Sequence, residues 1–319
     1  MSEAHPRPVR LAGITDEAGP DLDTQLAVLA RLGWDGIELR NVDGYALADL
    51  PAPDFARLVD RIAAAGLSTV CVDSRIANWA RPVTGPVETD LAELDVLAER
   101  CAALGTRYVR VMSYPNDGLS EAAWGAEVIR RMRLLAARAE RAGLVLLHEN
   151  CSGWAGSDPA RALRLLAEVD SPALGLVFDT GNGLEYGYEA YDMLRALLDG
   201  AADRILHVQV KDADGTAEEP VYRYPGAGAC RVPDQLRLLA GAGYTGAVSI
   251  EPHMVVSPHA GRMDTGTVGA DVFVEYGRRL GLLVDRTGFG KPREADGPPG
   301  TADAEAEAAG AGALAGAAL

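Results

Sequence analysis

Short apolar runs alternate with longer amphipathic segments along most of the chain. From residue 10 to about 284, runs of β-branched and apolar residues are followed by stretches with apolar residues three and four positions apart. The first pattern is typical of buried strands, and the second is typical of helices that cover a sheet. Their alternation predicts parallel strands that are joined by crossover helices.

The pattern predicts eight strands of this kind. We expect them at Leu11–Ile14, Gly36–Leu39, Ser68–Val72, Tyr108–Met112, Leu144–His148, Gly175–Phe178, Ile205–Val210 and Ala247–Ile250. Eight parallel strands close a TIM barrel, a fold that needs about 250 residues. The phrases LGWDGIEL, AAGLSTVCV, RAGLVLLHE and GAGYTGAVSI repeat one helix-to-strand pattern, which favours a repeated βα unit over two unrelated domains.

The chain therefore divides into three predicted parts. Residues 1–9 are an N-terminal extension, and residues 10–286 form a single (β/α)8 TIM barrel that carries the chemistry. Residues 287–319 are rich in Ala, Gly and Pro and have few large apolar side chains to bury, which predicts a disordered low-complexity tail.

Composition narrows the classes of function. A formal net charge of -16 opposes binding to nucleic acid, whose affinity comes largely from Lys and Arg. The four cysteines form no CxxC pair, which argues against a zinc knuckle or a disulfide framework. No apolar run is long enough for a signal peptide core or a membrane span. We expect a cytoplasmic protein with a small-molecule partner, and assembly into a homo-oligomer is left open.

Polar side chains close four consecutive predicted strands, at the end of the barrel where TIM-barrel enzymes carry their active sites. The segments are VLLHEN, LVFDTGN, ILHVQVKD and VSIEPH, and they supply Glu149, Asp179, Gln209 or His207, and Glu251. Carboxylate and amide oxygens suit a hard divalent cation, so we expect Mn²⁺ first, with Mg²⁺ or Co²⁺ as alternatives. Asp179 is also compatible with capping the TGNG turn, and Gln209 with filling a polar core.

Further polar and aromatic residues near these strand ends are candidates for substrate binding. They are His207, Asn182, Lys211, Arg223, His253, Trp154 and Glu38. Each also has a structural interpretation: Lys211 as the partner of a carboxylate, Arg223 as a surface residue and Trp154 as a packing anchor. The glycine-rich turn Gly226–Gly228 is a weak candidate for binding phosphate.

The segments IELR, HEN, FDTGN, HVQVKD and SIEPH together resemble the xylose-isomerase-like, sugar phosphate isomerase/epimerase family. The resemblance covers residues 10 to about 284. It implies one divalent cation bound by Glu149, Asp179, Gln209 and Glu251, with the two glutamates also acting as acid and base. His207 is the reserve ligand. Asn182 stands where epimerase relatives often carry a histidine, so contacts to substrate hydroxyls must differ.

The implied activity is isomerisation or epimerisation of a sugar, keto sugar or polyol, with or without a phosphate group. One glutamate removes a proton beside a carbonyl and the other returns it, through an enediolate that the cation stabilises. The alternative is a lyase or dehydratase that acts on a keto sugar or inosose, including cleavage of a 3-keto glycoside, with the same first step. A barrel that binds a sugar without turnover is a third interpretation.

Overall fold

The structure is a computed structural model that describes residues 9–257, 262–263 and 267–289. Most of the predicted N-terminal extension and of the predicted tail lies outside these residues. Within the described part of the chain, no helix is long and apolar enough to cross a membrane.

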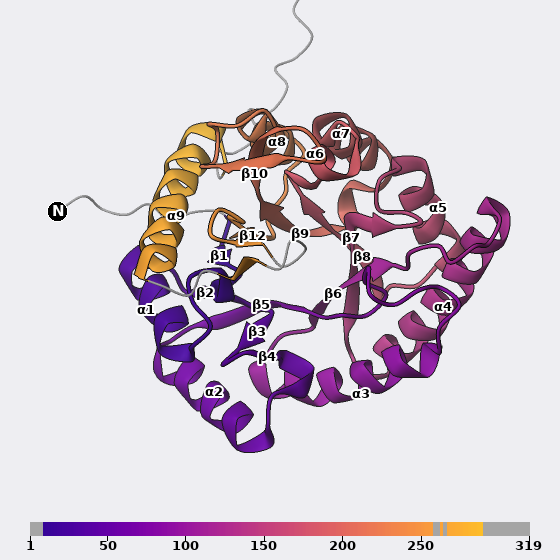
Figure 1. Ribbon diagram of the computed structural model, residues 1–319, viewed down its shortest axis with the longest axis horizontal. Coiled ribbons are helices and arrows are strands. Elements are labelled where there is room, and N and C mark those ends of the chain that lie inside the picture. The colour runs from indigo at the N-terminus through magenta and orange to yellow at the C-terminus, as the bar shows by residue number, and fades with distance from the viewer. Residues whose placement is uncertain (1–8, 258–261, 264–266, 290–319) are drawn as a thin grey trace, which may run out of the picture. The chain divides into compact units, whose positions relative to one another are not determined.

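Eight parallel strands form one sheet that curls into a nearly closed barrel, as predicted (Figure 1). The strands are β1 Leu11–Gly13, β2 Gly36–Leu39, β5 Ser68–Asp73, β6 Tyr108–Ser113, β7 Val145–Gly153, β8 Leu174–Asp179, β9 Ile205–Val210 and β12 Ala247–Ile250. Their order in the sheet is β1-β12-β9-β8-β7-β6-β5-β2. A parallel bridge between Ile14 and Glu38 joins the two end strands and closes the ring.

Helices surround the strands (Figure 1). They are α1 Leu22–Leu32, α2 Ala52–Ala64, α3 Val87–Leu104, α4 Glu121–Arg141, α5 Pro159–Val169, α6 Asn182–Tyr186, α7 Ala190–Ala201, α8 Val232–Gly241 and α9 Thr267–Thr287. Local sequence explains where several of them begin and end. The Asp21 side chain accepts a hydrogen bond from the Thr24 amide at the start of α1, and Gly33 ends that helix with a φ of 67°.

Short hairpins extend the loops at the carboxyl ends of the strands. β3 Asn41–Val42 pairs with β4 Tyr45–Ala46 after β2, and β10 Asp212–Gly215 pairs with β11 Pro220–Arg223 after β9. β13 Val256–Ser257 pairs with β14 Arg262–Met263 after β12. The polar residues discussed below lie at this end of the barrel.

Two apolar clusters stabilise the fold. The larger one packs the outward faces of the strands against the helices, and the smaller one is built from strand residues, among them Ala12, Cys71, Leu147 and Val177. Because apolar side chains take up these faces, the buried polar side chains gather at the carboxyl ends of the strands.

Candidate metal and active site

The four predicted metal ligands lie on neighbouring strands and are buried. Glu149 belongs to β7, Asp179 ends β8, Gln209 belongs to β9, and Glu251 follows β12. Asp179 and Gln209 are direct partners in the register of β8 and β9. The exposed fraction of each of the four residues is 5% or less. The barrel therefore brings these residues to one end, as the sequence predicts.

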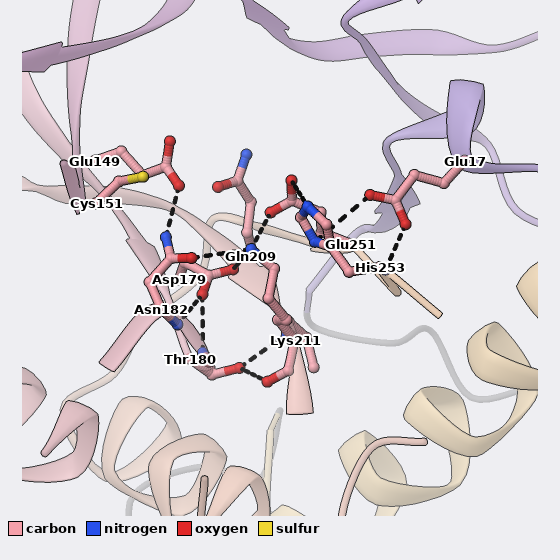
Figure 2. A network of polar contacts seen from close by, with 12 residues as sticks. Glu17, Glu149, Cys151, Asp179, Thr180, Asn182, Gln209, Lys211, Glu251 and His253 are labelled. Atoms are coloured by element: carbon pink, nitrogen blue, oxygen red, sulfur yellow. Dashed lines mark hydrogen bonds and ion pairs between the residues drawn. The ribbon is translucent and has the colours of Figure 1, made fainter. Parts of the chain in front are cut away.

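Lys211 and Asn182 connect the three carboxylates, Glu149, Asp179 and Glu251, into one network (Figure 2). The Lys211 ammonium lies 3.0 Å from Glu251 Oε2 and 3.7 Å from Asp179 Oδ2. It also donates to Asn182 Oδ1 at 2.9 Å, and Asn182 Nδ2 donates to Glu149 Oε1 at 2.8 Å. Lys211 and Asn182, both predicted to bind substrate, thus lie among the candidate ligands. Lys211 also pairs with carboxylates, as its alternative, structural interpretation expects.

Two arginines that the sequence analysis did not select, Arg110, which is buried, and Arg40, which is partly buried, bring positive charge to the carboxylates. Arg110 Nε lies 3.4 Å from Glu149 Oε2 and 3.2 Å from Asp73 Oδ1. Arg40 donates to Glu251 Oε1 at 2.9 Å through Nη1. Arg110 interrupts the apolar run YVRVM, and a charged residue in a buried strand is costly without a partner. This interruption of the apolar run is the sequence signal from which Arg110 could have been selected as a partner of buried carboxylates.

The environment shifts the pKa values of the three carboxyl groups in different directions. Burial raises the pKa of Asp179 to about 7, against the opposing effect of Lys211. Burial also raises the pKa of Glu149, against the opposing charge of Arg110. Burial acts in the same sense on Glu251, but its cationic neighbours, Lys211 first, outweigh burial and hold its pKa below the usual value. Glu149 therefore keeps a proton more readily than Glu251 does.

Glu38 and His207, both predicted to bind substrate, contact each other, and Glu38 also contacts Gln209. His207 Nε2 lies 2.8 Å from Glu38 Oε2, and Gln209 Nε2 donates to Glu38 Oε1 at 2.9 Å. Both oxygens of Glu38 are thus engaged by protein groups. The bond to Glu38 also occupies one ring nitrogen of His207, the reserve ligand.

The donor set at the strand ends fits a divalent cation. Among the described residues, Asp179 Oδ2 and Gln209 Oε1 are buried acceptors without a hydrogen-bond partner. Buried acceptors in this condition are costly, and a bound cation satisfies them. With the carboxylates of Glu149 and Glu251, all four candidate donors are oxygens.

Two other groups of possible ligands are tighter than the predicted one. In the described part of the chain, ligand atoms of Glu17, Glu251 and His253 lie within 4.8 Å of one another, and so do those of Glu38, Cys71 and Asp73. The three predicted carboxylates do not form such a group there, since Lys211 and Asn182 lie between them. Glu251 belongs to both the predicted set and the first tight group.

His253 lies beside Glu251, as expected for a residue of the site. Its Nε2 is 3.7 Å from Glu251 Oε1, and its ring stacks on Tyr222 with centroids 5.2 Å apart. The His253 backbone amide donates to Glu17 Oε2 at 2.6 Å. Glu17, from the first loop after β1, was not selected from the sequence. In the structure, burial raises its pKa to about 8.

Trp154 and Arg223 lie apart from the network, which corrects two predictions. The Trp154 ring is 2% exposed, its Nε1 donates to Glu121 at 2.9 Å, and Gly125 of α4 packs against its face. A ring packed this way cannot stack on a sugar. Arg223 has a side chain 46% exposed and pairs with Asp214 across the β10–β11 hairpin at 2.8 Å. The structural interpretations of both residues fit the structure.

The glycine-rich turn after β11 already holds an anion of the protein itself. Asp212 accepts from the backbone amides of Gly226, Gly228 and Cys230 at 2.8, 3.0 and 3.2 Å. A Cβ atom at Gly228 would lie 2.4 Å from Asp212 Oδ1. The weak prediction of a phosphate site in this turn is therefore wrong, because the carboxylate of Asp212 fills the amide cradle.

Comparison with known proteins agrees with this fold. Over 206 residues, the chain is 30% identical to 2-epi-5-epi-valiolone 7-phosphate 2-epimerase of Actinoplanes sp., covering 60% of this chain and 70% of that protein. The crystal structure of the IOLI protein with a zinc atom superposes with a TM-score of 0.71 at 17% identity, covering 89% of this chain and all of that one. A D-tagatose 3-epimerase-like protein gives a TM-score of 0.68 at 17% identity, with 88% and 98% covered.

The family model described as xylose isomerase-like TIM barrel matches residues 26–265, which is well over half of the chain. This range includes all four candidate ligands and seven of the eight barrel strands. The chain belongs to the xylose isomerase-like TIM barrel family.

Proposed function

We propose that the protein is a divalent-metal-dependent isomerase or epimerase of a sugar, keto sugar or polyol. The observation that carries this proposal is a pair of buried oxygens without a hydrogen-bond partner among the described residues, Asp179 Oδ2 and Gln209 Oε1, on paired residues of the neighbouring strands β8 and β9. Glu149, Asp179, Gln209 and Glu251 would hold one cation, Mn²⁺ first, with Mg²⁺ or Co²⁺ as alternatives. When bound, the cation polarises a carbonyl and so acidifies the neighbouring C–H.

In this proposal Glu149 and Glu251 exchange one proton with the substrate carbon. One carboxylate would remove the proton and the other would return one, and the lowered pKa of Glu251 and raised pKa of Glu149 favour Glu251 as the base and Glu149 as the acid. In the reverse direction the two exchange roles. Lys211 Nζ and Asn182 Nδ2 donate hydrogen bonds in the same network, and a substrate hydroxyl would bind beside them.

The similarity to an epimerase that acts on a phosphorylated valiolone supports a cyclic polyol or keto sugar as the substrate class. A test of each candidate substrate in its free and its phosphorylated form decides whether the substrate of this chain carries a phosphate. A cytoplasmic location and assembly into a homo-oligomer stay predictions.

Hydrogen exchange at carbon tests the proposal. Protein loaded with Mn²⁺ is incubated in D₂O with a panel of ketoses and inososes, each in free and phosphorylated form. We expect a substrate of the panel to gain solvent deuterium at the carbon beside its carbonyl. Glu149→Gln and Glu251→Gln should each slow this exchange about 10²-fold or more. Arg223→Gln, outside the network, serves as the control and should exchange at the wild-type rate.

The mass of the product separates the two reaction classes. A product of unchanged mass, apart from deuterium, supports the isomerase or epimerase. Loss of water or of an aglycone would instead assign the alternative, a lyase or dehydratase that uses the same first step. No exchange into any compound of the panel by metal-loaded protein would contradict both.

A further inference from the structure

Gln209 turns one of its two amide atoms toward the polar network, and the other is held by Glu38. Gln209 Nε2 donates to Glu38 Oε1 at 2.9 Å and, at the longer distance of 3.5 Å, to Asp73 Oδ1, while Gln209 Oε1 has no hydrogen-bond partner among the described residues. The two residues are 1% and 0% exposed. A flipped amide would set the Gln209 oxygen against the Glu38 carboxylate, and two acceptors at that distance repel. The buried carboxylate therefore permits one orientation.

Glu38 is itself fixed from two sides. Its second oxygen, Oε2, lies 2.8 Å from His207 Nε2, and His207 is 1% exposed. Its backbone forms the parallel bridge to Ile14 that closes the barrel. Glu38 therefore presents Oε1 to residue 209 from a rigid position, with no solvent to replace either hydrogen bond.

We propose that Glu38 is a positioning residue that fixes the Gln209 amide with its oxygen toward the cation. This rests on the proposed function, since it takes Gln209 as a ligand. The amide nitrogen carries two protons and offers no electron pair to a cation, so a flipped Gln209 would remove one of four donors. Loss of such a supporting partner typically weakens metal affinity about 10- to 100-fold.

An exchange of the two side chains tests this proposal with nearly constant shape. Gln209→Glu adds a carboxylate, which on charge alone should bind Mn²⁺ more tightly. The proposal predicts the opposite, because residue 209 then loses its donor and faces the Glu38 carboxylate. In the double variant Glu38→Gln/Gln209→Glu the bond is reversed: the residue 38 amide donates to residue 209, and its oxygen still accepts from His207.

Affinity for Mn²⁺ is measured by titration calorimetry, with thermal melts as the check on folding. We expect Gln209→Glu to bind about 10-fold or more weakly than wild type, and the double variant to recover to within about threefold. Folding of the double variant under conditions where Gln209→Glu alone does not fold supports the pairing equally.

Two results would overturn the inference. In the first, Gln209→Glu equals wild type in affinity and stability, which would mean that Glu38 does not constrain residue 209. In the second, the folded double variant binds Mn²⁺ as weakly as Gln209→Glu does. Wild-type protein that binds no Mn²⁺ at all would overturn the proposed metal site itself. That failure is distinguishable from failure of the positioning role of Glu38, because it is seen without any variant.

Discussion

Replacing Lys211 with methionine removes a buried positive charge while keeping a side chain of similar length. The Lys211 ammonium is 3.0 Å from Glu251 Oε2 and 3.7 Å from Asp179 Oδ2, and its side chain is 2% exposed. Removing one partner of a buried ion pair costs about 3–5 kcal/mol, because the other charge stays buried. At roughly 2 °C per kcal/mol for a domain of this size, the melting temperature should fall by about 6–10 °C.

The loss should also depend on pH. Burial raises the pKa of Asp179 from 3.8 to about 7 even with Lys211 in place. A carboxyl group whose folded-state pKa lies above its unfolded value contributes stability below the unfolded pKa, and that contribution is lost as pH rises through the folded pKa. Without the ammonium, the folded-state pKa of Asp179 rises further. The deficit of Lys211→Met relative to wild type should therefore be larger at pH 8 than at pH 5.

Thermal melts followed by circular dichroism at both pH values measure this deficit. Arg237→Met is the matched control, since the Arg237 side chain is 60% exposed and pairs with Asp234 at 2.6 Å. An exposed pair contributes about 0–1 kcal/mol, so the control should melt close to wild type. Equal melting temperatures for Lys211→Met and Arg237→Met at pH 8 would refute the assignment of Lys211 as the buried counter-charge.

Three further predictions concern residues around the network. Asp212→Ala leaves the part-buried amides of its loop without their charged acceptor and should cost about 1–3 kcal/mol in urea unfolding; added phosphate should restore part of this in the variant and none in wild type. Gly125→Ala places a Cβ 2.7 Å from the Trp154 ring and should lower unfolding free energy by about 1–3 kcal/mol, whereas a ring free to bind substrate would move aside without cost. Arg223→Ala should leave KM within about twofold, and a tenfold rise would restore its predicted role in binding substrate.

The barrel and its four candidate ligands were predictable because both follow from local patterns. Each strand is a short apolar run followed by an amphipathic helix, and each ligand stands at the end of its run. Parallel strands in a barrel meet at one end, so residues such as Glu149 and Glu251, about a hundred positions apart, converge without any knowledge of their contacts.

The partners of these residues were not predictable, because pairing depends on register across distant segments. Arg40 and Glu251 are 211 positions apart, and no local pattern connects them. Local sequence patterns also gave wrong predictions where another group of the protein already occupies the position expected for a ligand. The turn at Gly226–Gly228 has the composition of an anion site, but Asp212, at the start of the same loop, occupies it. Trp154 was assigned to a pocket because it follows a ligand strand, yet its neighbour is a helical glycine.

The seam of the barrel has a consequence for how the protein comes to hold an ion. Ile14 and Glu38 make the bridge between the first two barrel strands, and Glu38 is also the acceptor for the Gln209 amide. Opening of the barrel at this seam would displace Glu38 from the Gln209 amide. If Gln209 binds the proposed cation, closure of the barrel and completion of the binding site are linked, and a chain open at the seam should bind the cation more weakly.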